Sequence, residues 1–238
     1  MKFNSRLDGA AIRSAFAALF VLIIVVIIAE QVALAQYLHP KVVSKQTTIR
    51  KIVLLPAKIE VVKDSMKGPE GMAAESDLLG ARVNQLVTEV LAAKSVASAS
   101  GPAAGAEGGD AQQKYTIADI QSRYDALLPK IAKKKSDVKK GRFSLGDEVL
   151  NLNVDKTADA IVFVRGHGQR LTKGKTAFTL LVGGMPAYLR MSIGIVDAHS
   201  GEVLLYTDPV AVGDPTNPND TRLRKAIEKS LKKLPSAL

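Results

Sequence analysis

The 238-residue chain contains no cysteine, no tryptophan and only three histidines. Without cysteine it can form no disulfide framework, no cysteine-ligated zinc site and no catalytic thiolate, and it cannot carry a lipid-modified N-terminal cysteine. The histidines, His39, His167 and His199, are far apart in the sequence and do not indicate a multi-histidine metal centre. We therefore expect neither a metal site nor a cofactor.

Aromatic residues are also few, at 5% of the chain, whereas hydrophobic residues reach 47%. This hydrophobic share is sufficient for a packed core and excludes a wholly disordered chain. The chain has 33 Lys and Arg residues against 23 Asp and Glu residues, which gives a net charge of +10 at pH 7. Basic proteins often bind nucleic acid, but the scarcity of aromatic side chains for base stacking argues against nucleic acid as the partner.

The N-terminus has three zones: a basic segment over residues 1–13, an apolar run over residues 15–29, and the small-residue triplet that ends in Ala35. This is the layout of a secretory signal peptide, with Ala33 and Ala35 as the candidate cleavage residues. A membrane-spanning helix needs about 20 apolar residues, and this run is shorter. We expect residues 1–35 to be removed, which leaves a soluble periplasmic protein.

An uncleaved N-terminal segment is the alternative. Residues 32–35 are apolar and could extend the run into an inner-membrane anchor over residues 15–35. The basic end stays in the cytoplasm in both cases, so the rest of the chain is expected in the periplasm.

Hydrophobic periodicity predicts one domain after the N-terminal segment. Residues 36–48 show no helical or strand period and are expected to be a tether. Residues 95–113 are rich in Ala, Gly and Ser, and we expect them to be a flexible loop inside the domain; the alternative is a linker between two domains. Helices are predicted over residues 72–94, from residue 117 to a stop or kink at Pro129, over 144–153, and from residue 219 or 220. Strands are predicted over residues 49–55, 59–62, 160–164, 178–182, 188–196 and 203–206.

This order of elements predicts an α/β fold (mixed α+β), in which a single mixed β-sheet over residues 49–238 is flanked by helices. Pro56 is expected at a bulge or a sheet edge, because proline cannot donate a hydrogen bond to a neighbouring strand.

Few residues indicate catalysis. A nucleophilic triad needs a hydroxyl, a histidine and an orienting acid, and the sequence contains no G-x-S-x-G nucleophile motif. His167 and His199 are expected to be exposed loop residues. A periplasmic hydrolase, with one of these histidines beside an acid and a hydroxyl, is retained as an alternative.

Positive charge gathers between residues 130 and 142, where the only acid is Asp137. An exported cationic surface can contact anionic lipid headgroups or acidic proteins, and the alternative is a merely solvated surface. The candidate contact residues are Lys130, Lys133, Lys134, Lys135, Lys139, Lys140 and Arg142.

A second candidate contact is the apolar run over residues 176–187, TAFTLLVGGMPA. We expect a core strand followed by a turn. The alternative is an exposed apolar loop that contacts a membrane or a partner.

Three segments carry a resemblance to known proteins: KIVLLPAKIEV at residues 51–61, TADAIVFV at 157–164 and SIGIVDAHSGEVLL at 192–205. Together they resemble exported Gram-negative envelope proteins with the α/β domains of the curli-secretion lipoprotein CsgG, the penicillin-binding-protein activator LpoB and the amino-terminal part of TolB. The resemblance covers residues 49–235. It implies a mixed sheet flanked by helices, no catalysis and contacts with envelope components, but transfers no individual site residue. The lipoprotein members carry a lipidated cysteine that this chain lacks.

The sequence therefore predicts a non-enzymatic exported envelope protein with a binding or assembly role. Its expected partner is an envelope protein or an anionic membrane surface, and a homo-oligomer is a further alternative. The competing interpretations are a periplasmic hydrolase and a structural subunit anchored in the inner membrane.

Overall fold

The structure is a computed structural model that describes residues 36–100, 117–146, 149, 157–219 and 221–236. The chain divides into two compact units, Met1–Leu34 and Ala35–Leu238, and all of the described residues belong to the second. The expected signal or anchor segment, with Ala33 and Ala35, lies outside the described residues. Within the described part of the chain, no helix is long and apolar enough to cross a membrane.

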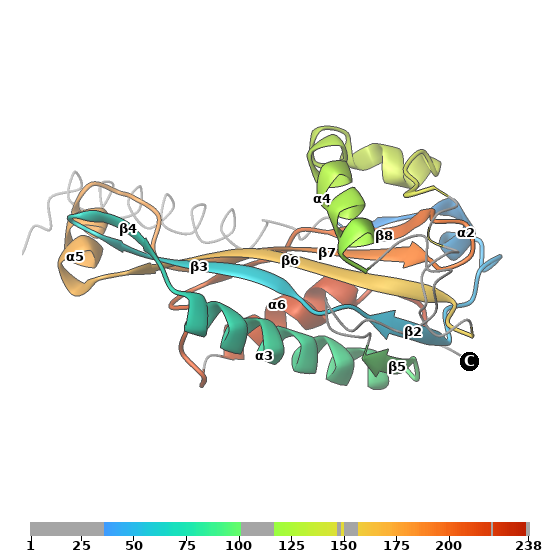
Figure 1. Cartoon of the computed structure of the whole chain (residues 1–238), viewed down its shortest axis with the longest axis horizontal. Helices are drawn as coiled ribbons and strands as arrows, with labels where there is room; N and C mark the ends of the chain where they lie inside the picture. Colours follow the sequence, from blue (N-terminus) through green and yellow to red (C-terminus); the bar gives the residue numbers. More distant parts are fainter. Residues whose placement is uncertain (1–35, 101–116, 147–148, 150–156, 220, 237–238) are drawn as a thin grey trace, which may run out of the picture. The chain divides into compact units, whose positions relative to one another are not determined.

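The described elements form one nine-stranded sheet with helices on both of its faces (Figure 1). The strands are β1 (Tyr37–Leu38), β2 (Lys51–Leu54), β3 (Lys58–Ser65), β4 (Gly68–Gly71), β5 (Ala97–Ser100), β6 (Ala160–Leu171), β7 (Tyr188–Asp197), β8 (Val203–Thr207) and β9 (Val210–Val212). The helices are α2 (Pro40–Val43), α3 (Ala73–Ala92), α4 (Ile117–Lys133), α5 (Lys173–Leu181), α6 (Thr221–Leu231) and the 3-10 helix η1 (Lys135–Lys140).

Strand β6 is the centre of the sheet, and its pairing confirms the predicted mixed topology. It runs parallel to β2 and β3 and antiparallel to β7, and the main strand order is β1-β8-β7-β6-β2-β5. Its apolar half supplies both cores: Val162 and Val164 pack on one face of the sheet, and Ile161 and Phe163 on the other. A strand buried on both faces is expected to be apolar throughout.

Pro56 lies in a break between β2 and β3 and not at the expected bulge or sheet edge, and its missing N–H suits a position outside the strands. Both strands pair with β6, β2 near its start and β3 along its second half. In the break, the N–H of Ala57 donates to Oδ1 of Asn84 at 3.2 Å. Strands β2 and β3, on either side of Pro56, therefore both pair with β6.

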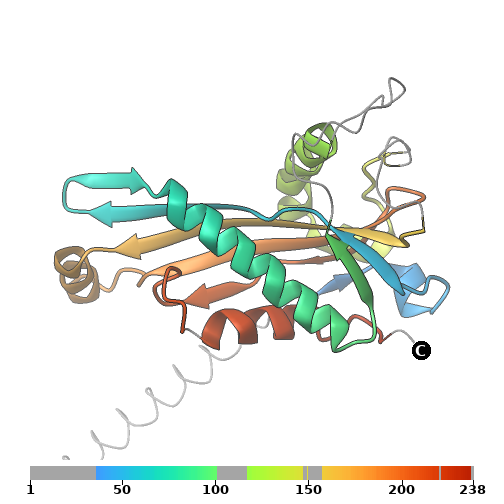
Figure 2. The same cartoon turned by 60° about the horizontal axis from the view of Figure 1, so that its bottom comes forward.

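Helices α3 and α6 cover one face of the sheet (Figure 2). Leu79, Val83, Leu86 and Val90 recur at helical spacing along α3 and are all buried. Leu78, beside this stripe in the sequence, is 72% exposed. Helix α6 packs Leu223, Ile227 and Leu231 into the same core, and Leu234 is buried just beyond it.

Helix α4 and η1 cover the opposite face around a stacked aromatic pair. The ring centroids of Tyr124 and Phe163 lie 4.5 Å apart, with 17° between the ring planes. Gly194 pairs with Phe163 on β7, and a Cβ atom there would lie 2.2 Å from the Tyr124 hydroxyl oxygen. Only glycine leaves room for this ring. The helix also continues past Pro129 to Lys133 instead of ending at the proline.

Residues 36–48 are packed against the domain and do not form the expected tether. Strand β1 pairs with β8, and Val42 of α2 is 1% exposed. The side chain of Gln36 donates to the carbonyl of Lys229 and accepts the N–H of Lys233 at 2.8 Å, so it joins the chain to the end of α6. A two-residue strand has no measurable period, and sequence patterning therefore cannot detect it.

Part of the expected flexible loop over residues 95–113 is a strand. Ala97–Ser100 forms strand β5, which pairs in parallel with β2 at the edge of the sheet. Residues 101–116 lie outside the described residues, as does most of the helix expected over residues 144–153.

His39 begins α2 and is 4% exposed. Its Nδ1 accepts the backbone N–H of Lys41 at 3.1 Å, and its Nε2 is buried with no hydrogen-bond partner. Burial lowers the pKa of His39 below its ordinary value of 6.5, because the charged imidazolium loses hydration, although nearby Glu202 partly opposes this change. The fold therefore favours neutral His39.

We predict that acid destabilises the domain through this residue. A lowered pKa means that the stability from neutral His39 is complete above about pH 6.5 and is lost as the pH falls through the lowered value. The control is His39→Asn, which keeps a capping oxygen but does not titrate. Thermal unfolding from pH 8 to 5 should show a smaller loss of stability in this variant, and equal losses would contradict the assignment.

Candidate functional site

The apolar run over residues 176–187 begins as a helix, α5, and not as the expected core strand. Thr172 starts the helix by accepting the N–H of Thr176 at 2.8 Å through its carbonyl. Gly183 has φ of +68° and ends it, and the N–H of Gly184 donates to the carbonyl of Thr179 at 2.7 Å. These contacts are those of a glycine-terminated helix.

The described side chains of α5 and of the turn after it have inverted polarity. Among them Thr179 is buried, at 8% exposed, whereas Phe178 is 49% and Leu181 86% exposed. Val182 and Met185 follow, at 63% and 50% exposed. A helix on a globular domain normally turns its apolar side inward. The core-strand interpretation of this run is therefore wrong. Its side chains are exposed, as the alternative expected, but the run begins as a helix and not as a loop.

The hairpin between β3 and β4 lies beside α5 (Figure 1). Asp64 of β3 joins the two: its carbonyl accepts the N–H of Thr172 at 3.1 Å, and its carboxylate lies 3.7 Å from Lys175 Nζ. Met66, at the hairpin turn, is 68% exposed. We call the exposed apolar side chains of α5, its following turn and this hairpin the tip surface: Met66, Phe178, Leu181, Val182 and Met185.

The surroundings of the tip surface are cationic. No acidic residue occurs between residues 172 and 187. Lys67 and Lys173 are exposed and form no ion pair with a described residue. Lys63 is paired with Glu70 at 3.7 Å. Two lysines are thus left with their charges free for an external partner.

The basic residues between positions 130 and 142 fall into two groups: some contact described residues of the domain, and others do not. Lys135 forms an ion pair with Asp208, which follows β8. Lys139 Nζ lies 5.5 Å from the ring centroid of Tyr37 in β1. These two lysines therefore fasten η1 to the sheet.

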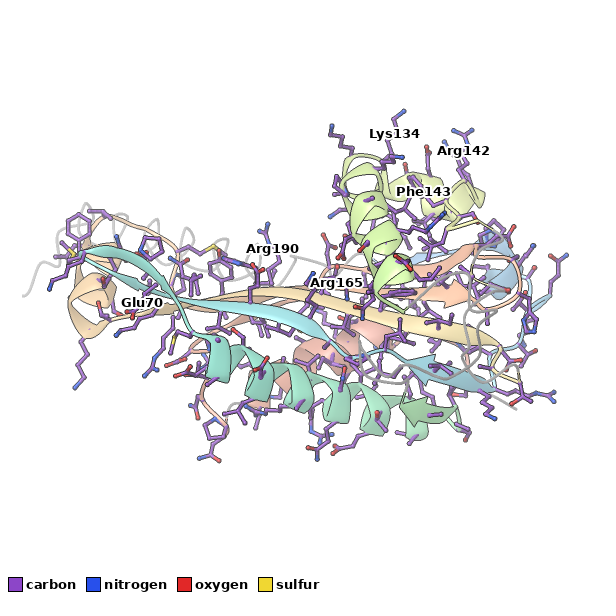
Figure 3. The ribbon with its side chains drawn as sticks, viewed as in Figure 1. Glu70, Lys134, Arg142, Phe143, Arg165 and Arg190 are labelled. Carbon is purple, nitrogen blue, oxygen red and sulfur yellow. The ribbon has the colours of Figure 1, made fainter. Side chains whose placement is uncertain are left out.

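Two more cations of this group, Lys140 and Arg142, lie 3.4 and 3.6 Å from the carboxylate of Asp137. Figure 3 shows Lys134 and Arg142 on the side of η1 that faces away from the sheet. The exposed cations of the group with neither an ion pair to a described residue nor an aromatic contact are Lys130, Lys133 and Lys134. The seven-residue contact surface stays a prediction, and these three are its cations without such a partner among the described residues.

We predict that these two subsets differ in their effect on stability. Replacing Lys130, Lys133 and Lys134 together by Gln should change the free energy of unfolding by about 0.5 kcal/mol or less per site, because these side chains are solvated. Lys135→Gln should lower it by up to about 1 kcal/mol, the range for a partly exposed ion pair. Urea unfolding measures both, and a loss per site in the triple variant as large as the loss for Lys135→Gln would contradict the division.

The histidines do not form a catalytic arrangement among the described side chains. His167 lies in β6, not in the expected loop, between Glu60 of β3 and Arg190 of β7. It lines a cleft of about 550 Å³ that also contains Ser192. His199 is in the exposed turn after β7. Among the described residues, neither imidazole is hydrogen-bonded to an acid and a hydroxyl, as the hydrolase alternative requires.

Arg165 is the feature of this cleft that sequence reasoning missed. It is 9% exposed, its Nε donates to Asp125 of α4, and its Nη1 donates to the carbonyl of Val164 at 3.0 Å. Figure 3 shows Arg165 on the face of the sheet that carries α4. A charge directly after an apolar strand was the available signal. The contact holds α4 on the sheet, so its evident role is structural.

Comparisons with known proteins give weak similarities. No family model and no curated protein matches the sequence. The PelC dodecamer of Paraburkholderia phytofirmans has a TM-score of 0.43 and 11% identity, covering 86% of this chain and 97% of that chain. Lipoprotein GNA1162 of Neisseria meningitidis has a TM-score of 0.33 and 13% identity, covering 77% and 94%. The C-terminal domain of LpoB from Salmonella enterica has a TM-score of 0.23 and 10% identity, covering 72% and 93%. At these scores, no residue role or activity is transferred to this chain.

Proposed function

We propose that this chain is an exported, non-enzymatic protein of the bacterial envelope that contacts another envelope component through its tip surface. The N-terminal layout supports export, and the inverted polarity of α5 is the observation that carries the contact role. The domain itself acts as a rigid support, since both of its cores lie within residues 36–236.

An exposed apolar cluster is costly for a soluble domain. Burial of apolar surface is worth roughly 25 cal/mol per Å². Isolated exposed apolar residues are common, whereas a cluster on adjacent elements marks a contact site. Phe178, Leu181, Val182 and Met66 form such a cluster over α5 and the neighbouring hairpin. A covered state of this surface is therefore more stable than an exposed one.

The three free lysines at the end of α4 are proposed as a secondary, electrostatic contact with an anionic component. Their contribution should weaken with salt, because exposed charges are screened within about 8 Å at physiological ionic strength. They supply attraction but, unlike the tip surface, no apolar area.

Photo-crosslinking in living cells tests the contact role. A photoreactive residue is placed at Leu181 in the tip surface or, as a matched control, at Leu78, a leucine that is 72% exposed on α3. We expect crosslinked species at position 181 that are absent at position 78. The same pattern at both positions, or none at 181, would refute the proposed contact.

A further inference from the structure

We propose that the component covering the tip surface is an anionic lipid leaflet. This inference rests on the proposed contact function and names its partner. It follows from two properties that occur together on α5 and the hairpin: exposed apolar side chains and unpaired lysines beside them. Interfacial membrane-binding segments combine the same two properties, because acyl chains accept the apolar groups and lipid phosphates attract the cations.

The length of α5 determines how it meets the lipid. Its nine residues span about 13 Å at 1.5 Å per residue, far less than the hydrocarbon core of about 30 Å. The helix therefore cannot cross the leaflets. Phe178 and Leu181 enter the boundary between headgroups and acyl chains, and Lys67 and Lys173 remain at the headgroup level.

Charge also distinguishes lipid from a second copy of the chain. In a two-fold contact, the same patch of each copy faces the other. Lys67 and Lys173 would then approach the same lysines of the partner copy, and the nearby acids, Asp64 and Glu70, are already paired with Lys175 and Lys63. An anionic leaflet removes this repulsion, so it fits the patch better than a copy does.

The absence of cysteine allows the full chain to be tested with a single label. An environment-sensitive fluorophore is attached to Leu181→Cys or to the control Leu78→Cys, and the protein is mixed with vesicles of phosphatidylcholine, with or without phosphatidylglycerol. We expect a blue shift at position 181 only with anionic vesicles, and no shift at position 78. The control matters because the apolar N-terminal segment can itself attach the chain to vesicles.

Substitution of Lys67 and Lys173 provides a second test of the lipid partner. Each basic residue near an anionic surface contributes on the order of 1 kcal/mol, so Lys67→Gln with Lys173→Gln should weaken the anionic-vesicle response at position 181 by at least about tenfold. Added salt should have the same effect in the unaltered chain. An unchanged response in the double variant would overturn the proposal.

The remaining outcomes separate this inference from the proposed function. A label at position 181 that stays exposed to water with anionic vesicles, while crosslinking in cells succeeds, overturns the lipid partner and leaves the contact function. A blue shift that grows with protein concentration in the absence of lipid assigns the patch to a second copy and also overturns it. A shift of equal size with phosphatidylcholine alone would refute the role of the lysines.

Discussion

Truncation of Tyr124 to alanine is expected to lower the free energy of unfolding by about 3–5 kcal/mol, the range for removing a buried aromatic ring. The ring is fully buried against Phe163 and fills the space above Gly194. Its loss leaves a cavity between α4 and the sheet, in the smaller of the two cores. Urea unfolding monitored by circular dichroism measures the change.

Two matched variants test the cause of this loss. Tyr124→Phe keeps the ring and removes a buried hydroxyl that has no hydrogen-bond partner, so it should cost less than about 1 kcal/mol. Gly194→Ala places a methyl group against the ring and should cost about 1–3 kcal/mol. A loss below about 1 kcal/mol for Tyr124→Ala would show that α4 is not part of the cooperative core.

Replacement of Phe178 and Leu181 by serine should weaken vesicle binding strongly and change the free energy of unfolding little. Both side chains are exposed, and surface substitutions usually change stability by about 0.5 kcal/mol or less each. Partial burial of each in an anionic leaflet is worth on the order of 1.5 kcal/mol, so the pair should weaken vesicle binding by about 100-fold.

Co-sedimentation with anionic vesicles measures this effect on residues 36–238, which contain both cores. Leu78→Ser is the control, because it removes a leucine of α3 that is also largely exposed, at 72%, and should leave binding unchanged. Unaltered binding in the Phe178 and Leu181 double variant would show that the tip surface does not bind the vesicles. A large loss of stability would show that α5 is packed.

Sequence patterning succeeded where a segment is buried on both faces or along a whole stripe. The first residues of β6 are apolar without interruption because both cores need them, and Leu79 and Val83 of α3 recur at helical spacing. Such patterns reflect burial in the segment itself. These patterns were sufficient to predict the mixed sheet flanked by helices.

The same method failed for α5 because a short apolar run does not distinguish a helix from a strand. The local signals were present in Thr172 before the run and Gly183 after it, but apolar character was taken as burial. Exposure depends on whether another element covers the segment, and nothing within residues 176–187 carries this information.

Long-range contacts account for the other differences. Gln36 contacts the end of α6, and Lys135 pairs with Asp208. Each partner lies far away in the sequence and is brought near only by the sheet. The packing of residues 36–48 and the ion pair of Lys135 could therefore not be predicted from the sequence alone.

The reactivity of single cysteines in cells tests directly whether the tip surface is covered in the envelope. Leu181→Cys and Leu78→Cys are each treated with a membrane-impermeant maleimide, once in purified protein and once in cells with a permeabilised outer membrane. We expect both thiols to react rapidly in purified protein, and only the thiol at position 181 to become protected in the envelope. Equal reactivity of the two thiols in the envelope would contradict this expectation.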